Sequence, residues 1–168
     1  MSSTYFLTAT RFVILVLAQV LVFNQLNLST AVIPYVYLLY LVWFPFKEQR
    51  LFFIVSAFLL GLSIDVFSNS GGVHAAATVT AAYARPFILK LILGISYENQ
   101  NLKLKDITAY QKVAFVAVLV SCHHLALFFL EIFNLRLWGY TLTKVLFSVI
   151  FTSLLSLLIL YLFSSRKK

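Results

Sequence analysis

The stretch GLSIDVFSNSGGVHAAATVTAAYARP, residues 61–86, is the most informative part of this chain. It holds Asp65, His74 and Arg85 within a sequence that is otherwise apolar almost from end to end. A charged side chain in such surroundings is costly, so it needs a structural or a functional reason. The polar residues of this stretch are therefore the first candidates for a site.

The composition is typical of an integral membrane protein. Hydrophobic residues make up 62% of the 168 residues and charged residues only 11%, whereas a soluble domain usually has about 25% charged residues. Such a chain cannot cover its own surface with polar side chains, so we expect the bilayer to be its solvent. We also expect a single membrane domain over residues 1–168, because the longest polar segment, residues 96–111, is too short to fold alone.

Six apolar segments predict an all-α polytopic membrane protein with about six transmembrane helices in one bundle. They cover residues 12–23, 32–46, 51–67, 73–94, 113–133 and 142–163. A straight span needs about 20 residues. The first two segments are shorter, so one of them is expected to be broken, tilted or extended by polar residues. Five spans remain the alternative count.

The basic residues predict the orientation in the membrane. The net charge is +8, and Lys and Arg concentrate in the loop of residues 96–111, in the tail of residues 164–168 and after the second segment. The turn of residues 68–72 has none. Because basic loops stay on the cytoplasmic side, we expect both termini in the cytoplasm and the turn outside. Membrane topology explains the positive charge, so no nucleic-acid partner is expected.

Gly61 and Asp65 lie one helical turn apart and share a face of the third segment. Gly61 would let a neighbouring backbone approach closely. Gly72 ends a tight, uncharged turn that follows. Two interpretations of Asp65 stay open, namely capping of the fourth segment and a role in binding.

The fourth segment is rich in alanine, and His74, Thr78 and Arg85 recur on one of its faces. A proton or ion path could use such a stripe. The favoured interpretation is an interior stripe that bonds to neighbouring helices, with Arg85 extending toward the cytoplasm. Pro86 disfavours helix at the residue before it, so we expect a kink or a stop there, with residues 87–95 along the inner surface.

The fifth segment holds His123, His124 and Glu131. Adjacent histidines point about 100° apart on a helix and cannot chelate one metal together. A metalloprotease helix has its histidines four apart around a glutamate, and that HExxH pattern is absent. Glu131 lies near the outer interface, where it could pair with Arg136. A GxSxG elbow and a phosphate-binding loop are also absent, so the sequence predicts no enzyme, no metal and no cofactor.

These residues resemble the family of the rod shape-determining protein MreD. The resemblance is most specific where the family pattern G-L-x-x-D … G-x-x-A … R matches GLSID at residues 61–65, GVHA at residues 72–75 and Arg85. The Pro34-Tyr35 pair and the run HHLALFFLE at residues 123–131 also fit, and VHAAA and ARP suggest the Bacteroidetes-type branch. By size and span layout the resemblance covers nearly the whole chain.

The resemblance implies a small multi-pass protein of the bacterial inner membrane. Members belong to the machinery that builds lateral peptidoglycan, and no enzymatic activity is assigned to the family. They associate with MreC, and through it with the actin-like MreB, the polymerase RodA and a penicillin-binding transpeptidase. The fold of the family is similar to that of the substrate-binding subunits of energy-coupling-factor transporters, so a small-ligand site stays possible.

Two functions are therefore expected from the sequence. The first is a non-enzymatic scaffold for cell-shape control, which docks the transmembrane helix of MreC against Gly61 and the small residues of the fourth segment. The alternative is a membrane substrate-binding or transport subunit that uses Asp65, His74 and Arg85 around an outward-facing cavity. The candidate residues for helix packing or partner docking are Gly61, Asp65, Gly72, His74, Thr78, Arg85, Pro86, His124 and Glu131.

Overall fold

The computed structural model describes the backbone of residues 2–26, 33–46, 49–94, 102–132 and 138–164. All regular elements in these ranges are helical. They are α1 (Ser2–Leu21), η1 (Phe23–Gln25), η2 (Val36–Leu38), α2 (Leu39–Trp43), α3 (Arg50–Ser68), α4 (Val73–Leu93), α5 (Ala109–Ile132) and α6 (Trp138–Ser164), where η marks a 3₁₀ helix. Within the described residues, five helices (α1 and α3 to α6) are long and apolar enough to cross a membrane. The chain is thus a helical, multi-pass membrane bundle.

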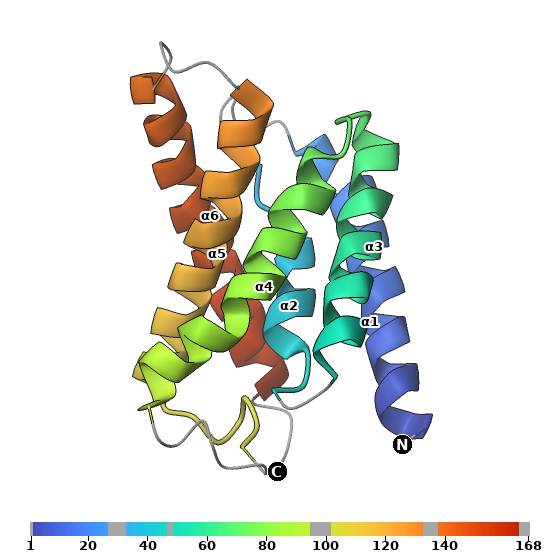
Figure 1. Ribbon diagram of the computed structural model, residues 1–168, viewed down its shortest axis with the longest axis vertical. Coiled ribbons are helices and arrows are strands. Elements are labelled where there is room, and N and C mark those ends of the chain that lie inside the picture. Colours follow the sequence, from blue (N-terminus) through green and yellow to red (C-terminus); the bar gives the residue numbers. More distant parts are fainter. Residues whose placement is uncertain (1, 27–32, 47–48, 95–101, 133–137, 165–168) are drawn as a thin grey trace.

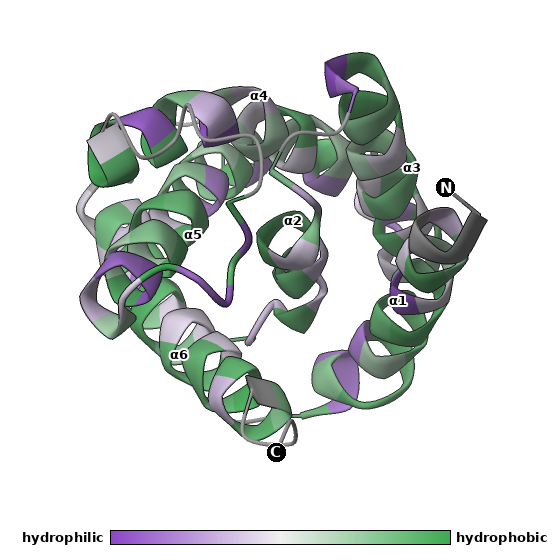
Figure 2. Ribbon diagram, turned by 90° about the horizontal axis from the view of Figure 1, so that it is seen from below, coloured by the Kyte–Doolittle hydropathy of each residue, from purple (hydrophilic) through white to green (hydrophobic). Residues whose placement is uncertain are grey.

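The five long helices surround the short helix α2. Seen along the bundle, α1, α3, α4, α5 and α6 form a ring, and α2 lies inside it (Figure 2). The α3–α4 connection lies at one end of the bundle, called here the turn end (Figure 1). Helix α1 begins and α6 ends at the opposite end, called here the terminal end. Residues 102–108 precede α5 at this terminal end, where Ile107 is buried against the bundle.

Among the described residues the count of membrane-length helices is five, as the alternative count has it, and not six, because the second segment is the broken one. In place of a membrane-length helix over residues 32–46, the described part of that segment holds only η2 and α2. Every residue from 35 to 42 is at most 8% exposed, so this segment is buried on all sides. Pro34 and Pro45 explain its shortness, because proline removes a backbone donor and disfavours helix at the preceding residue. Phe44 is accordingly extended, with ψ 138°.

The α3–α4 hairpin forms as the sequence predicts, with a tight turn at residues 68–72. Asn69 ends α3 in the left-handed conformation with φ 51°, and Gly72 precedes α4 with φ 96°. The two helices approach so closely that a Cβ atom on Gly61 would lie 2.5 Å from the Cα atom of Ala75. Helix α4 then continues through Pro86 to Leu93. A stop at Pro86 is therefore wrong, and residues 87–93 belong to α4.

The small residues of α4 pack inside the chain. Ala75, Ala77, Ala81 and Ala82 are buried, and α4 packs against both α3 and α5. Close approach of helices without bulky side chains is how small residues stabilise a membrane bundle. The face that the sequence offered for docking a partner is thus covered by this chain's own helices, together with Gly61.

We expect Gly61→Ala to destabilise the bundle by about 1–3 kcal/mol, the usual cost of overpacking. The added methyl group would meet backbone atoms of α4, which cannot move aside as a flexible side chain can. Thermal unfolding of the purified protein in detergent measures the effect.

The matched control is Gly139→Ala in the first turn of α6, where a Cβ atom would meet nothing within 4 Å. This change should be neutral or slightly stabilising, because alanine favours helix over glycine. Equal effects of the two substitutions would contradict the close α3–α4 contact.

Candidate functional site

The central segment of residues 33–46 has backbone groups that its short helices leave unpaired. Lipid supplies no hydrogen bonds, so non-helical backbone is tolerated at membrane depth only where protein surrounds and satisfies it. Toward the turn end, Gln19 of α1 satisfies two of these backbone groups, one with its side-chain nitrogen and one with its side-chain oxygen. Its Nε2 donates to the Pro34 carbonyl oxygen at 3.2 Å, and its Oε1 accepts the Tyr37 N–H at 3.3 Å. Thr152 Oγ1 of α6 accepts the Tyr35 N–H at 3.1 Å.

Two arginines satisfy the other end of the same segment. Arg85 of α4 donates from Nη2 to the Phe44 carbonyl oxygen and from Nη1 to that of Pro45 at 3.4 Å. Arg11 of α1 donates to the Trp43 carbonyl oxygen at 3.3 Å. These carbonyls follow the last turn of α2, where a helix leaves its acceptors free. The arginines therefore cap α2.

Arg85 turns into the protein, so the expected extension toward the cytoplasm is wrong. Its side chain is only 3% exposed. The guanidinium carbon lies 4.9 Å from the ring centre of Phe53, 5.3 Å from that of Phe46 and 5.8 Å from that of Phe115. Aromatic faces attract a cation, and they complete the surroundings of this buried charge.

A chain of polar rings lies at the middle of the bundle. The Tyr37 hydroxyl is 3.1 Å from Nδ1 of His74 on α4 and 2.9 Å from Nε2 of His123 on α5. His124 Nε2 lies 3.3 Å from Thr152 Oγ1, and its Nδ1 lies 2.8 Å from the Val120 carbonyl oxygen. The expected interior stripe on α4 is thus present at His74, which bonds to the central segment.

Thr78 and the three histidines are buried, and each makes at least one hydrogen bond within the chain. Thr78 Oγ1 donates to the His74 carbonyl oxygen at 2.6 Å. His123 Nδ1 is buried and has no hydrogen-bond partner among the described residues. In the described part of the chain, no three His, Cys, Asp or Glu residues are grouped so that they could hold a metal ion.

Asp65 caps the start of α4, which is one of the two interpretations that the sequence left open. Its Oδ1 accepts the Ser70 hydroxyl at 2.6 Å and the His74 N–H at 3.0 Å. Its Oδ2 accepts the Ala75 N–H at 2.8 Å. These donors belong to the first turn of α4 and to the turn before it, where backbone N–H groups lack helical partners and a negative charge is favourable. The carboxylate therefore joins α3 to α4.

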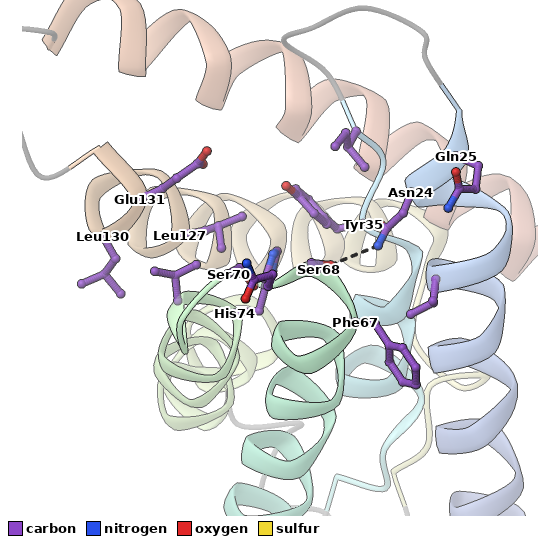
Figure 3. A pocket seen from close by; sticks show the side chains of 14 residues that line it. Asn24, Gln25, Tyr35, Phe67, Ser68, Ser70, His74, Leu127, Leu130 and Glu131 are labelled. Atoms are coloured by element: carbon purple, nitrogen blue, oxygen red, sulfur yellow. Dashed lines mark hydrogen bonds between the residues drawn. The ribbon is translucent and has the colours of Figure 1, made fainter.

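A cavity of about 580 Å³ opens at the turn end of the bundle. Its walls come from α1, η1, the segment before η2, the α3–α4 turn and α5 (Figure 3). The polar residues that line it are Asn24, Gln25, Tyr35, Ser68, Asn69, Ser70, His74 and Glu131, and the apolar ones are Val20, Ile33, Phe67, Val73, Leu127 and Leu130. Of the predicted site residues, His74 and Glu131 line this cavity.

The remaining predicted residues lie elsewhere. Asp65 bonds to the first turn of α4, whereas Arg85 bonds to the carbonyls that follow α2. They do not form one site. The predicted pair of Glu131 with Arg136 lies outside the described residues, because residues 133–137 are not among them.

The sequence reasoning missed Gln19 and Tyr37, although both are central to the hydrogen bonding of the bundle. Gln19 had a signal, since it is a lone amide in an apolar helix and is completely buried. The Nε2 atom of Gln19 also donates to Asn24 Oδ1 at 2.9 Å. Asn24 in turn donates to Ser68 Oγ at 3.1 Å, which links α1 to the hairpin.

Comparisons of the chain with protein-family models, with curated proteins and with solved structures found no match. Function is therefore inferred from the geometry of the described residues and from the sequence resemblance alone.

We expect Asp65→Ala to lower the free energy of unfolding by about 1–3 kcal/mol, because two backbone N–H groups and one hydroxyl lose a charged acceptor. Asp65→Asn should cost less, since the amide oxygen can still accept from one of them. Ser70→Ala, which removes one donor and leaves the cap, is the control. Thermal unfolding in detergent ranks the three variants, and a loss for Ser70→Ala as large as that for Asp65→Ala would contradict the capping role.

Tyr37→Phe should cost about 1–3 kcal/mol, because it leaves buried ring nitrogens of His74 and His123 without their common partner. The ring shape is kept, so the loss reports the hydroxyl alone. Tyr83→Phe on the exposed face of α4 is the matched control and should change stability by less than about 0.5 kcal/mol. Chemical denaturation in mild detergent compares the two, and an unchanged midpoint for Tyr37→Phe would refute the hydrogen-bonded network.

Proposed function

We propose that this chain is a non-enzymatic component of the bacterial cell-elongation machinery, embedded in the inner membrane with both termini in the cytoplasm. The multi-pass helical bundle supports a location in a membrane. The resemblance of residues 61–86 to the MreD family supplies the specific role. Cell-shape control through the enzymes of peptidoglycan synthesis follows from that resemblance.

The observation that carries the proposal is that the residues of the MreD-like pattern shape the α3–α4 hairpin. Gly61 allows the α3–α4 contact, Asp65 caps α4, and Gly72 supplies a positive φ before it. Each of these residues shapes one helical hairpin, and Arg85 caps α2. A pattern of this kind describes a fold and not an active site, which supports a role without catalysis.

The proposed partner is the transmembrane helix of MreC, and through it MreB, RodA and a penicillin-binding transpeptidase. Because Gly61 and the alanines of α4 are covered within the chain, a partner helix has to meet an outward face of the ring. Helices α1 and α6 are the least buried of the five long helices. We therefore propose their outer faces as the docking surface, in place of the hairpin.

The positions of the basic residues support an orientation with the terminal end in the cytoplasm. Arg50 starts α3, Lys90 lies in the last turn of α4, and Lys103, Lys105 and Lys112 precede or begin α5. All of them lie toward the terminal end. Because basic residues are retained in the cytoplasm, that end would face MreB, and the turn end would face the side on which peptidoglycan is built.

A substrate-binding subunit is the second candidate, and the cavity at the turn end is the observation that favours it. A cavity of about 580 Å³ is within the usual size of small-ligand sites. The sequence predicted a binding cavity that uses Asp65, His74 and Arg85. The observed cavity differs, because Asp65 and Arg85 bond to backbone atoms and do not line it. The similarity in fold to energy-coupling-factor subunits remains part of this second proposal.

Depletion of the chain from its own rod-shaped host is expected to give round cells, and re-expression should restore rods. Photoreactive residues in place of Ile14 on α1 and Phe151 on α6 should yield adducts with MreC, since both side chains are exposed. Tyr83 on the exposed face of α4 is the control position and should yield far fewer. Rod-shaped depleted cells, together with no MreC adduct from any position, would overturn the scaffold proposal.

A further inference from the structure

We propose that the cavity at the turn end binds an organic ammonium group, with its hydrocarbon part against the apolar wall. The site does not depend on the scaffold role, and either proposal can fail alone. It follows from two deeply buried side chains that present polar atoms to the cavity, from the charge of its lining and from the buried segment beyond its inner end.

Tyr35 and His74 form the buried polar part of the lining. They are 8% and 6% exposed, and they come from the segment before η2 and from α4. Among the described residues, Tyr35 Oη has no hydrogen-bond partner, and the ring of His74 is bonded only through Nδ1, to Tyr37. Neither Tyr35 Oη nor His74 Nε2 is among the fully buried side-chain atoms without a partner, so both can be reached by water or by a ligand. The cavity is the place from which such a partner can reach both residues (Figure 3).

The charge of the lining favours a cation. Among the described residues that line it, Glu131 is the only charged one, and none is Lys or Arg. Within the described part of the chain, Glu131 has neither a hydrogen bond nor an ion pair. An anionic ligand would therefore meet a carboxylate and no basic side chain among the described lining residues. A cation would instead find a counter-charge in the Glu131 carboxylate.

Aromatic and apolar groups narrow the chemistry further. The lining includes the rings of Tyr35 and Phe67, and aromatic faces attract ammonium groups, including quaternary ones. Leu127, Leu130 and Val73 supply a surface for hydrocarbon. An ammonium group joined to a short apolar or hydroxylated chain matches this combination better than a bare metal ion, which would need several oxygen ligands.

The inner end of the cavity indicates binding and not passage. Beyond His74, the polar chain continues through Tyr37 to His123. It ends there, since His123 Nδ1 is buried and has no further partner among the described residues. The surrounding residues 36–42 are apolar or aromatic, and each is at most 3% exposed. A ligand that enters at the turn end would therefore leave by the same end.

An ammonium group at this depth has two sources, a soluble amine or the headgroup of an amine-bearing lipid. Both offer the same chemistry to Glu131 and Tyr35. Because the cavity opens at one end of a membrane bundle, either can reach it.

The test uses the full chain, purified in detergent free of amine lipids. Choline and ethanolamine are titrated while binding is followed by isothermal calorimetry, with glycerol 3-phosphate as the anionic comparison. In parallel, unfolding temperatures are compared in nanodiscs of phosphatidylethanolamine and of phosphatidylglycerol. Binding of choline or ethanolamine supports the site with a soluble source, and stabilisation only by phosphatidylethanolamine supports it with a lipid source.

Glu131→Gln should weaken ammonium binding by about three- to tenfold, as expected for an exposed ion pair with an aromatic neighbour. The matched control is Asp106→Asn, which removes one negative charge at the terminal end. Tyr35→Phe should weaken binding of the hydroxylated amines again, and it keeps the aromatic ring. Equal affinity of the wild type and Glu131→Gln, equal binding of glycerol 3-phosphate, or no response to any amine would overturn the proposal.

Discussion

The backbone of the central segment is the constraint on which this bundle depends. A helix of five residues inside a membrane cannot satisfy its own N–H and C=O groups, and lipid cannot satisfy them either. Gln19 and Thr152 do so at one end of the segment and Arg85 and Arg11 at the other. Three of the five surrounding helices, α1, α4 and α6, are thereby bound to the backbone of the central segment through hydrogen bonds as well as through packing.

This constraint changes how polar residues in an apolar chain should be interpreted. Arg85 and Asp65 are costly in a bilayer, which makes them natural candidates for catalysis or transport. Each instead bonds to backbone groups that would otherwise be unsatisfied, Asp65 at the start of α4 and Arg85 at the end of α2. Their cost is offset by the groups they satisfy. Only His74 and Glu131, among the predicted residues, also face a space that could hold something else.

The sequence was sufficient for α3 to α6 and for the hairpin, because these depend on local features, whereas α1 begins at Ser2, well before the apolar segment of residues 12–23. Runs of apolar residues predict spans, and the Asn and Gly residues of the 68–72 turn supply its positive φ angles. The position of α2 was not predictable in this way. A segment that is apolar on every side looks the same whether lipid or protein surrounds it. The separation of Pro34 and Pro45 by fewer residues than a span needs was the available signal. The direction of Arg85 depends on that same segment, so it was missed for the same reason.

The cavity and the central segment share residues, and this joins the two ends of the bundle. Tyr35 lines the cavity with its side chain, while its N–H donates to Thr152. His74 lines the same cavity, while its Nδ1 bonds to Tyr37. A ligand that orders Tyr35 and His74 would therefore also order the start of the central segment, whose other end is held by Arg11 and Arg85 near the basic terminal end. The cavity at the turn end and the arginines near the terminal end are thus in contact with the same buried segment.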